Sequence, residues 1–315
     1  MSADPSRFED PILELRRELE GISSSGPTDR KRVAQLEKEL TRVSREIYGN
    51  LTPWQKTLVA RNGGRPYTLD FIEHLFEDFV ELQGDRRYSD DPSIVAGFAR
   101  FGTTACAVIG HQKGRDTREK IRRNFGMPRP EGYRKALRIM KMAEKFGRPI
   151  ITFVDTPGAY PGVGAEERGQ AEAIATNLRE MAHIRVPIIV IVTGEGGSGG
   201  ALALGVGDRV MMFEHAIYSV ISPEGCAAIL WKDPAAAQIA AEVMKITAQD
   251  LAGLGIIDEV VPEPVGGAHS NVGETMELLR VRLAKALEVL LKLKPEPLVA
   301  ARYQKFRKMG VFEIA

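Results

Sequence analysis

The sequence predicts a layered α/β fold, and two observations lead to it. Between Ser93 and Pro262, short runs rich in β-branched residues alternate with alanine-rich segments of helical periodicity, which is typical of strands and helices that follow one another along the chain. Three of the predicted strands also end at glycine-bearing turns that lead into helices, so backbone N–H groups collect along one edge of the sheet. We therefore expect the chemistry at that edge.

The composition limits the classes of protein to which the chain can belong. Its 315 residues, 43% hydrophobic and 27% charged, suit one large catalytic domain with appendages or two modest domains. A formal net charge of +1 gives no overall field that would hold the chain on nucleic acid or on a membrane. The two cysteines, of which Cys106 lies in an apolar run, argue against a disulfide scaffold and a cysteine-ligated metal site. Because Met1–Asp10 lacks the apolar stretch of a signal peptide and Ile188–Val192 is too short to cross a membrane, we expect a soluble, cytoplasmic protein.

The first fifty residues predict a helical hairpin. Apolar residues recur at helical spacing over Phe8–Glu20 and again over Asp29–Tyr48. The stretch Gly21–Pro27 between them is rich in turn formers, and Thr28 or Asp29 can cap the second helix. Such a hairpin is either a solvated arm packed on its own domain or an assembly element for a partner subunit, and the sequence leaves both interpretations open.

The remaining elements follow from the same periodicities, in chain order. Predicted strands, each rich in β-branched residues, are Ile94–Phe101, Thr104–Gly110, Ile150–Asp155, Ile188–Thr193, Val210–Phe213, Ile217–Ile221 and Ile256–Val261. Predicted helices are Glu131–Phe146, Ala165–His183, Ser198–Gly205, Pro223–Leu230, Thr247–Leu254 and Thr275–Leu293. A proline-containing stretch and a basic tail follow the last helix.

The strongest single signal is the segment Ile188–Gly205. An uninterrupted β-branched strand runs into a turn that holds five glycines and then into small residues compatible with a helix. Missing side chains let a ligand approach the backbone closely. The unpaired N–H groups at the start of the following helix, with the positive end of its dipole, can stabilise an enolate or a ureido oxygen. The competing interpretation is a glycine turn kept only for tight packing of strand against helix.

The same segment satisfies the nucleophile-elbow pattern G-x-S-x-G, as Gly196, Ser198 and Gly200. A serine hydrolase that uses Ser198 would need a base, for which His215 and His269 are available downstream. Against it, further glycines flank the serine on both sides, and no His-Gly-Gly-Gly oxyanion motif lies upstream. Serine hydrolysis stays open as an alternative.

A second buried strand opens into a Pro/Gly turn at Ile150–Gly162. Its Asp155-Thr156-Pro157-Gly158 is similar to the Asp-x-x-Gly motif of GTPases, but the sequence has no G-x-x-x-x-G-K-[ST] loop to hold phosphates. Nucleotide hydrolysis is therefore disfavoured. The acids at the start of the following helix are explained by its dipole, although either could face a site.

A third feature is the basic segment Lys113–Lys141. It holds eleven Lys or Arg against three acids, a local excess of +8 in a molecule whose total is +1. This excess fits either a groove for phosphate groups such as those of coenzyme A, an acidic partner, or a solvated helix face. Few aromatic residues lie among the charges, which disfavours single-stranded nucleic acid as the ligand.

Several motifs resemble those of the carboxyltransferase alpha-subunit family of bacterial acetyl-CoA carboxylases. They are Leu82-Gln83-Gly84-Asp85-Arg86, Gly110-His111-Gln112-Lys113-Gly114-Arg115-Asp116, Asn124-Phe125-Gly126-Met127, Pro130-Glu131-Gly132-Tyr133-Arg134-Lys135-Ala136, Asp155–Gly162, Gly194–Ala201 and Tyr218–Gly225. The resemblance implies a crotonase-like fold of ββα repeats over residues 51–265. An N-terminal helical arm (1–50) and a C-terminal helix with its tail (266–315) would flank it.

The resemblance also implies an activity and partners. Members of that family transfer the carboxyl group from carboxybiotin, on a biotin carboxyl carrier protein, to the thioester acetyl-CoA, which gives malonyl-CoA for fatty-acid biosynthesis. Biotin is thus not attached to this chain, and a biotin carboxylase belongs to the same system. A beta subunit shares the site, in an assembly of two alpha and two beta chains, and is expected to hold the zinc; this chain has no closely spaced cysteine pair.

By resemblance, the oxyanion hole falls on backbone groups rather than on acid–base side chains. Its expected residues are Gly196, Gly197, Gly199, Gly200 and Ala201. Expected substrate-binding residues are Gly158, Ala159, Tyr160, Pro161, Gly162, Ser222, Pro223, Glu224, Gly225, Lys113 and Arg115. Two other interpretations stay open: an enoyl-CoA hydratase or isomerase that moves a proton with Glu195 or Glu224, and a scaffold subunit without catalysis of its own.

Overall fold

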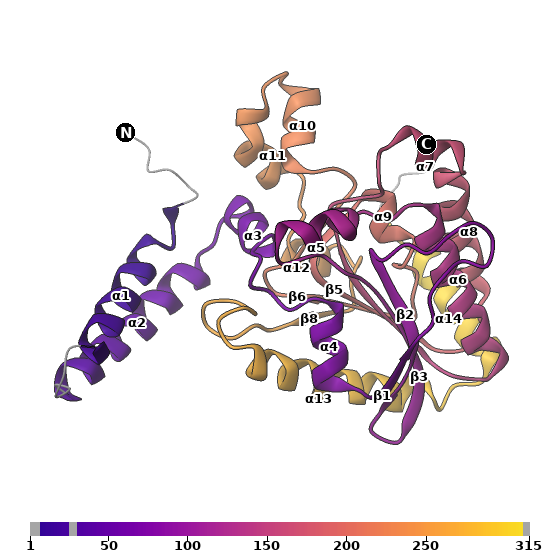
Figure 1. Cartoon of the computed structure of the whole chain (residues 1–315), viewed down its shortest axis with the longest axis horizontal. Helices are drawn as coiled ribbons and strands as arrows, with labels where there is room; N and C mark the ends of the chain where they lie inside the picture. The colour runs from indigo at the N-terminus through magenta and orange to yellow at the C-terminus, as the bar shows by residue number, and fades with distance from the viewer. Residues whose placement is uncertain (1–6, 25–29, 311–315) are drawn as a thin grey trace.

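The computed structural model describes residues 7–24 and 30–310 (Figure 1). Its helices are α1 (Asp10–Ser24), α2 (Arg30–Gly49), α3 (Pro53–Ala60), α4 (Thr68–Leu75), α5 (Thr117–Arg122), α6 (Pro130–Lys145), α7 (Val163–Glu167), α8 (Gln170–His183), α9 (Ser198–Leu202), α10 (Pro223–Leu230), α11 (Ala237–Val243), α12 (Ala248–Gly253), α13 (Val272–Leu290) and α14 (Pro295–Arg307). Its strands are β1 (Glu77–Glu81), β2 (Ile94–Phe101), β3 (Thr104–His111), β4 (Ile150–Thr156), β5 (Ile188–Gly197), β6 (Arg209–Phe213), β7 (Ile217–Ser219) and β8 (Glu259–Val261). The predicted layered α/β architecture is confirmed.

The sheet places the ends of β4 and β5 next to each other. Strands β1, β2 and β3 pair antiparallel, and β3, β4, β5, β6 and β8 then follow in parallel, with β7 paired to the end of β5. Every residue of β4 is buried, and so is all of β5 except Gly197, as expected for central strands covered on both faces. The pairing of Thr156 with Gly196 brings both following turns to one edge.

Helices cover both faces of this sheet. Helix α6 packs on β2 and β3 and contacts α8, which in turn contacts α14, while α13 packs against α4 and β8 (Figure 1). The main hydrophobic core joins residues from the strands with inward-facing residues of α4, α6 and α13, including Phe71, Ile139 and Leu279. The C-terminal helices are thus part of the main body.

The N-terminal hairpin projects from this body. Helices α1 and α2 lie side by side, joined by an ion pair between Arg32 and Glu18 at 2.5 Å, and extend away from the sheet (Figure 1). A separate small core that includes Ile12 and Tyr48 holds their base. The two predicted helices are confirmed, but Gly21–Ser24 belongs to α1 rather than to a turn, and the predicted caps Thr28 and Asp29 lie outside the described residues.

The structure corrects other predicted boundaries for local reasons. The single helix predicted over Ala165–His183 is two helices, because Gly169 adopts φ 84° between α7 and α8. The expected basic tail contains a helix, α14, with proline at its start, where the missing N–H costs nothing. Strand β1 and the helices α3, α4, α5 and α11 were not among the predicted elements.

Candidate functional site

The turn after β5 is built on the backbone of the turn after β4. A Cβ atom added to Gly197 would lie 2.2 Å from the Pro157 carbonyl oxygen, and one added to Gly200 would lie 2.6 Å from the Gly158 carbonyl carbon. No real side chain fits at such distances, so glycine is required at both positions for the close approach. Two of the predicted segments, Gly196–Ala201 and Gly158–Gly162, are therefore in direct contact.

Helix α9 begins with backbone amides that have no intrahelical acceptor, as the first turn of any helix does. Its N-cap, Gly197, provides no side-chain oxygen to bond them. Ser198 has φ 50°, a left-handed conformation that is strained for a residue with a side chain and that turns the chain sharply from strand to helix. This geometry leaves the amides of Gly199 and Gly200 as candidate donors to a ligand.

A cavity of ≈ 500 Å³ opens beside this turn. Ser198, Gly199 and Leu202 form part of its wall, and Tyr218 and Ile221 from the β7 segment form another part. Phe306 and Met309, from the C-terminal helix and its end, line it as well. The walls are mainly apolar side chains, so the cavity suits a flat or aliphatic group whose polar atoms reach the turn.

The other predicted pocket segments take different positions around the turn. Tyr160 N–H donates to the Pro128 carbonyl at 3.0 Å, and the Arg129 guanidinium lies 4.8 Å from the centre of the Tyr160 ring. Ser222 caps α10 by accepting from Gly225 N–H at 3.1 Å. Loop and cap are thus held in place without blocking the cavity wall.

A cluster of charged side chains surrounds the first residues of the turn. Lys113 Nζ lies 2.8 Å from Asp155 and 3.0 Å from Glu195, while Arg61 lies 2.7 Å from Glu195 and 2.5 Å from Glu224. Glu195 N–H also donates to Asp155 at 2.9 Å. The cluster ties α3 and β3 to the ends of β4 and β5.

These contacts keep both glutamates ionised. Burial raises the pKa of Glu195, but the positive charges of Lys113 and Arg61 outweigh it and the pKa is lowered. Burial likewise raises the pKa of Glu224, and its hydrogen bonds with Arg61 lower it overall. A hydratase or isomerase needs a carboxyl group that exchanges a proton near neutral pH. The lowered pKa values of both groups argue against that interpretation.

The predicted phosphate-binding residues already have carboxylate partners. The Lys113 side chain is 14% exposed, and Asp155 and Glu195 compensate its charge. Its contacts therefore support the turn structurally. Arg115 is more exposed; it pairs with Asp70 at 2.5 Å and lies 4.7 Å from the centre of the Tyr67 ring. Of the two, Arg115 has the accessible position that contact with a ligand requires.

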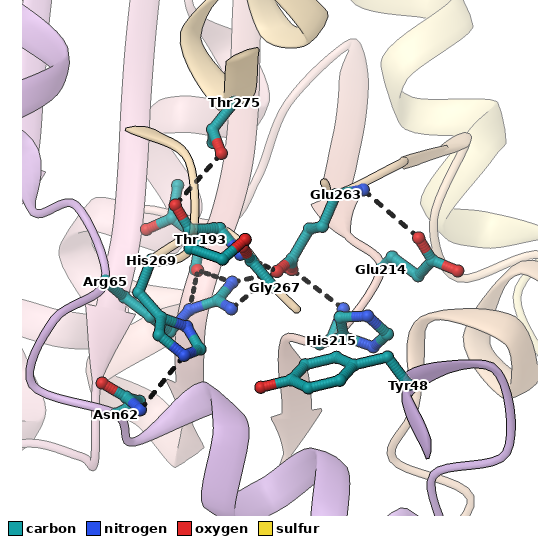
Figure 2. Close-up of polar contacts among 12 residues, drawn as sticks. Tyr48, Asn62, Arg65, Thr193, Glu214, His215, Glu263, Gly267, His269 and Thr275 are labelled. Atoms are coloured by element: carbon teal, nitrogen blue, oxygen red, sulfur yellow. Dashed lines mark hydrogen bonds and ion pairs between the residues drawn. The ribbon is translucent and has the colours of Figure 1, made fainter. Parts of the chain in front are cut away.

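A second polar network holds the strand that leads into the turn (Figure 2). The buried Arg65 guanidinium donates to the Thr193 carbonyl at 2.8 Å and pairs with both oxygens of Glu263, each at 2.8 Å. Glu263 also accepts from the backbone N–H of His215 at 3.0 Å. Burial raises the pKa of Glu263, but Arg65 outweighs it and lowers the pKa to about 2.

The sequence interpretation missed this network, as it missed Arg61. Arg61 and Arg65 lie after a helix, in the run Arg-Asn-Gly-Gly-Arg, and their partners Glu195, Glu224 and Glu263 are more than one hundred residues away. No local motif marks such pairs. Two arginines around a Gly-Gly turn are the one signal that could have suggested a fixed, charged loop.

The same network contains His215 and His269, the two histidines considered as the base of a serine hydrolase. The His215 ring packs edge-on against Tyr48, with ring centres 5.5 Å apart. His269 has its Nε2 3.3 Å from Asn62 Nδ2. Both histidines thus take part in this network (Figure 2) rather than in a contact with Ser198.

Neither a cluster of metal-ligating side chains nor a membrane-spanning helix occurs in the described residues. Among residues 7–24 and 30–310, no group of three or more His, Cys, Asp or Glu side chains is arranged to hold a metal ion. In the same residues, none of the helices combines the length and the apolar character that a membrane span requires.

The sequence is similar to a characterised group of proteins over nearly its whole length. The family model described as "Acetyl co-enzyme A carboxylase carboxyltransferase-like" matches residues 6–310. The "Acetyl-coenzyme A carboxylase carboxyl transferase subunit alpha" of Syntrophotalea carbinolica is 60% identical over 310 residues, which are 97% of this chain and 98% of that protein. The protein of the same name from Geobacter metallireducens is 58% identical over 308 residues, 97% of each chain.

Solved structures of carboxyltransferase type share the fold at lower identity. Transcarboxylase 12S with methylmalonyl-coenzyme A and methylmalonic acid bound has a TM-score of 0.60 and 22% identity, over 74% of this chain and 43% of that chain. A Pseudomonas malonate decarboxylase hetero-tetramer in complex with coenzyme A has a TM-score of 0.60 and 18% identity, over 75% of this chain and 91% of that chain. The expected crotonase-like fold is confirmed by these neighbours.

Proposed function

This chain belongs to the acetyl co-enzyme A carboxylase carboxyltransferase-like family, and from that membership we propose that its Gly196–Ala201 turn forms the oxyanion hole of the reaction. The chain is a carboxyltransferase alpha subunit of acetyl-CoA carboxylase. The observation that carries the proposal is the uncapped start of α9 in the wall of a cavity, with glycine required on both sides of Ser198.

Biotin on a biotin carboxyl carrier protein supplies the carboxyl group, and acetyl-CoA accepts it to give malonyl-CoA. The size and the apolar walls of the cavity beside Gly199 suit the bicyclic ring of biotin. Amides of Gly199 and Gly200 face the developing negative charge on a bound oxygen and stabilise it through fixed dipoles. Ala201, with Gly196 and Gly197, holds these amides in place through the β5 pairing and the first turn of α9.

The remaining predicted residues surround the glycine turn and do not themselves line the cavity. The Gly158–Gly162 turn contacts Gly200, and Ser222 caps α10, the helix that carries Glu224. Arg115, 46% exposed, is placed to attract a phosphate of coenzyme A, whereas Lys113 fixes Glu195. No side chain of this set is required to carry a proton, which agrees with the lowered pKa values of Glu195 and Glu224.

A beta subunit completes the site. The pair α10 and α11 stands out from the body (Figure 1). It exposes large apolar side chains to solvent, among them Ile229, Leu230, Ile239 and Val243, and such exposed patches are typical of protein interfaces. We assign this pair to contact with the beta subunit, in an assembly of two alpha and two beta chains that also works with the carrier protein and a biotin carboxylase. The zinc expected of such complexes lies in the beta subunit. The free thiols Cys106 and Cys226 fit a reducing cytoplasm.

Reconstitution tests the division of labour. The full-length chain is combined with a beta subunit, biocytin and malonyl-CoA, and acetyl-CoA formation in the reverse reaction is measured with and without this chain. We expect turnover only when both chains are present. Full turnover by the beta subunit alone would show that this chain is a scaffold and would overturn the proposal.

A further inference from the structure

A second cavity, of ≈ 290 Å³, lies between the loop after β1 and the helices α6 and α8. Four arginines line it together with two acids: Arg86, Arg87, Arg134, Arg138, Asp85 and Glu172. It is separate from the cavity beside the glycine turn, because the two share no lining residue. It brings together two features that the carboxyl-transfer site leaves unexplained, the Leu82–Arg86 motif and part of the basic segment.

The acids in this cavity do not balance its arginines. Asp85 accepts three backbone N–H groups, those of Arg87, Tyr88 and Ser89, through one oxygen, so its role is to hold the loop. Glu172 pairs with Arg134 at 3.1 Å. Within the described part of the chain, no ion pair joins Arg86, Arg87 or Arg138 to a carboxylate.

Arg138 is held in place by neutral groups only. Its Nε donates to the Gly84 carbonyl at 3.1 Å and its Nη2 to the Leu82 carbonyl at 3.1 Å. Burial and, next, the positive charge of Arg86 lower the pKa of Arg138, which is the direction expected for like charges held together. Carbonyl groups fix the guanidinium but do not cancel its charge.

Two more features concern the backbone and the hydrogen bonds of these arginines. Arg86 has φ 62°, a left-handed conformation that costs energy for a residue other than glycine and that the loop maintains. Arg134 Nε is buried and has no hydrogen-bond partner within the described structure. A buried donor without a partner is destabilising, and an acceptor bound there would offset that cost.

We propose that this cavity binds a phosphorylated small molecule through Arg86, Arg134 and Arg138. A guanidinium group bonds two phosphate oxygens at once, and several of them around one cavity match a dianion better than a single carboxylate. The limited volume favours a phosphate or diphosphate group over the acidic surface of a protein. The ligand supplies the negative charge that would compensate the three arginines.

Calorimetric titration of the full-length chain with pyrophosphate, at constant ionic strength, tests this proposal. We expect saturable binding that the double variant Arg86→Gln/Arg138→Gln weakens by at least about 10-fold, because two charge-assisted contacts are lost. Arg148→Gln, an exposed arginine away from the cavity, is the matched control and is expected to bind as the unaltered chain does. Because Arg138 also donates to the Gly84 and Leu82 carbonyls, the melting temperature of the double variant without anions is measured alongside its affinity.

Coenzyme A and pyrophosphate, titrated in parallel, distinguish the two sources of phosphate. Tighter binding of coenzyme A, lost in the double variant, would assign the site to the nucleotide end of the substrate. Equal binding of both would assign it to a separate phosphorylated compound. If the double variant does not fold, as judged by circular dichroism, the single variant Arg86→Gln replaces it because that side chain is exposed.

Unchanged affinity in the variant would overturn the proposal, and so would stabilisation by chloride as large as that by pyrophosphate. A lack of pyrophosphate binding, together with weaker beta-subunit binding by the double variant, would assign the arginines to a protein interface instead and would equally overturn it.

Discussion

Replacing Gly200 with alanine tests whether the contact between the two turns sets the geometry of the oxyanion hole. A Cβ at this position would lie 2.6 Å from the Gly158 carbonyl carbon and 2.7 Å from the Ala159 nitrogen. Both are backbone atoms, which cannot swing aside as the end of a side chain can. To restore ordinary contact near 3.4 Å, the turns must separate by roughly 0.8 Å.

A displacement of this size is large for a catalytic site. Misplacement of reacting groups by about 1 Å can reduce a rate by about 100-fold, and loss of one oxyanion donor costs about 100- to 1,000-fold in kcat. We therefore expect Gly200→Ala to lower kcat by about 100-fold or more in the reconstituted complex. Overpacking of this kind also costs about 1–3 kcal/mol of folding free energy, so the variant should still fold.

Two other glycines provide controls for this experiment. A Cβ on Gly253 meets no atom within 4 Å, so Gly253→Ala should retain full turnover. A Cβ on Gly199 lies 3.5 Å from Ile174, which is an ordinary contact, so Gly199→Ala should keep the melting temperature of the unaltered chain. Any change in kcat in this variant then reflects the added methyl group in the cavity wall and not a displacement of the two turns. Wild-type kcat in a folded Gly200→Ala complex would refute the reasoning, because the contact would then have no catalytic consequence.

Three further predictions concern the charged groups behind the turn. Glu263→Ala leaves Arg65 buried without a counter-ion and should cost about 3–5 kcal/mol in urea unfolding, whereas Glu288→Ala, at an exposed pair, should leave the midpoint unchanged. Because the folded pKa of Glu263 is lowered from 4.5 to about 2, its stabilisation is present above pH 4.5 and is lost as the pH falls toward 2. Acid unfolding should therefore be less steep in Glu263→Gln, and an identical profile would contradict this. Lys113→Met should lower kcat by about 10- to 100-fold, since uncompensated negative charge then lies near the oxyanion, while exposed Lys120→Met should not; equal rates in the two variants would contradict it.

The sequence predicted those parts of the fold that depend on local periodicity. Strand β2 and helix α10 have the predicted bounds, because a run of apolar residues marks the strand and a proline after a capping serine marks the start of the helix. Strand β1 was missed because it lies at the edge of the sheet with four of its five residues exposed, so it has no apolar pattern. The break at Gly169 was missed because a glycine inside a helical pattern does not reveal its φ value.

The glycine turn could be predicted as a candidate site, but the side chains that support it could not. Five glycines that follow a run of apolar residues indicate that a ligand can approach the backbone, and this signal does not depend on which elements become neighbours in the fold. Pairing of Lys113 with Glu195, or of Arg65 with Glu263, depends on which strands become neighbours. That information is in the tertiary structure, and the excess of basic residues in the segment 113–141 indicated only that partners must exist.

Glu195 raises a problem that the charge cluster resolves. Its ionised carboxylate lies near the end of β5, directly before Gly196 and Gly197, and its field would oppose a negative charge on a ligand oxygen. Arg61 and Lys113 bind its two oxygens, one each, so most of that field is cancelled where it arises. Asp155 accepts a hydrogen bond from the Glu195 N–H and also pairs with Lys113, so it keeps Lys113 in position beside Glu195. In the oxyanion hole that we propose, the amides of the following turn then act on an oxyanion without an uncompensated carboxylate beside them, so the position of Glu195 is compatible with that proposal.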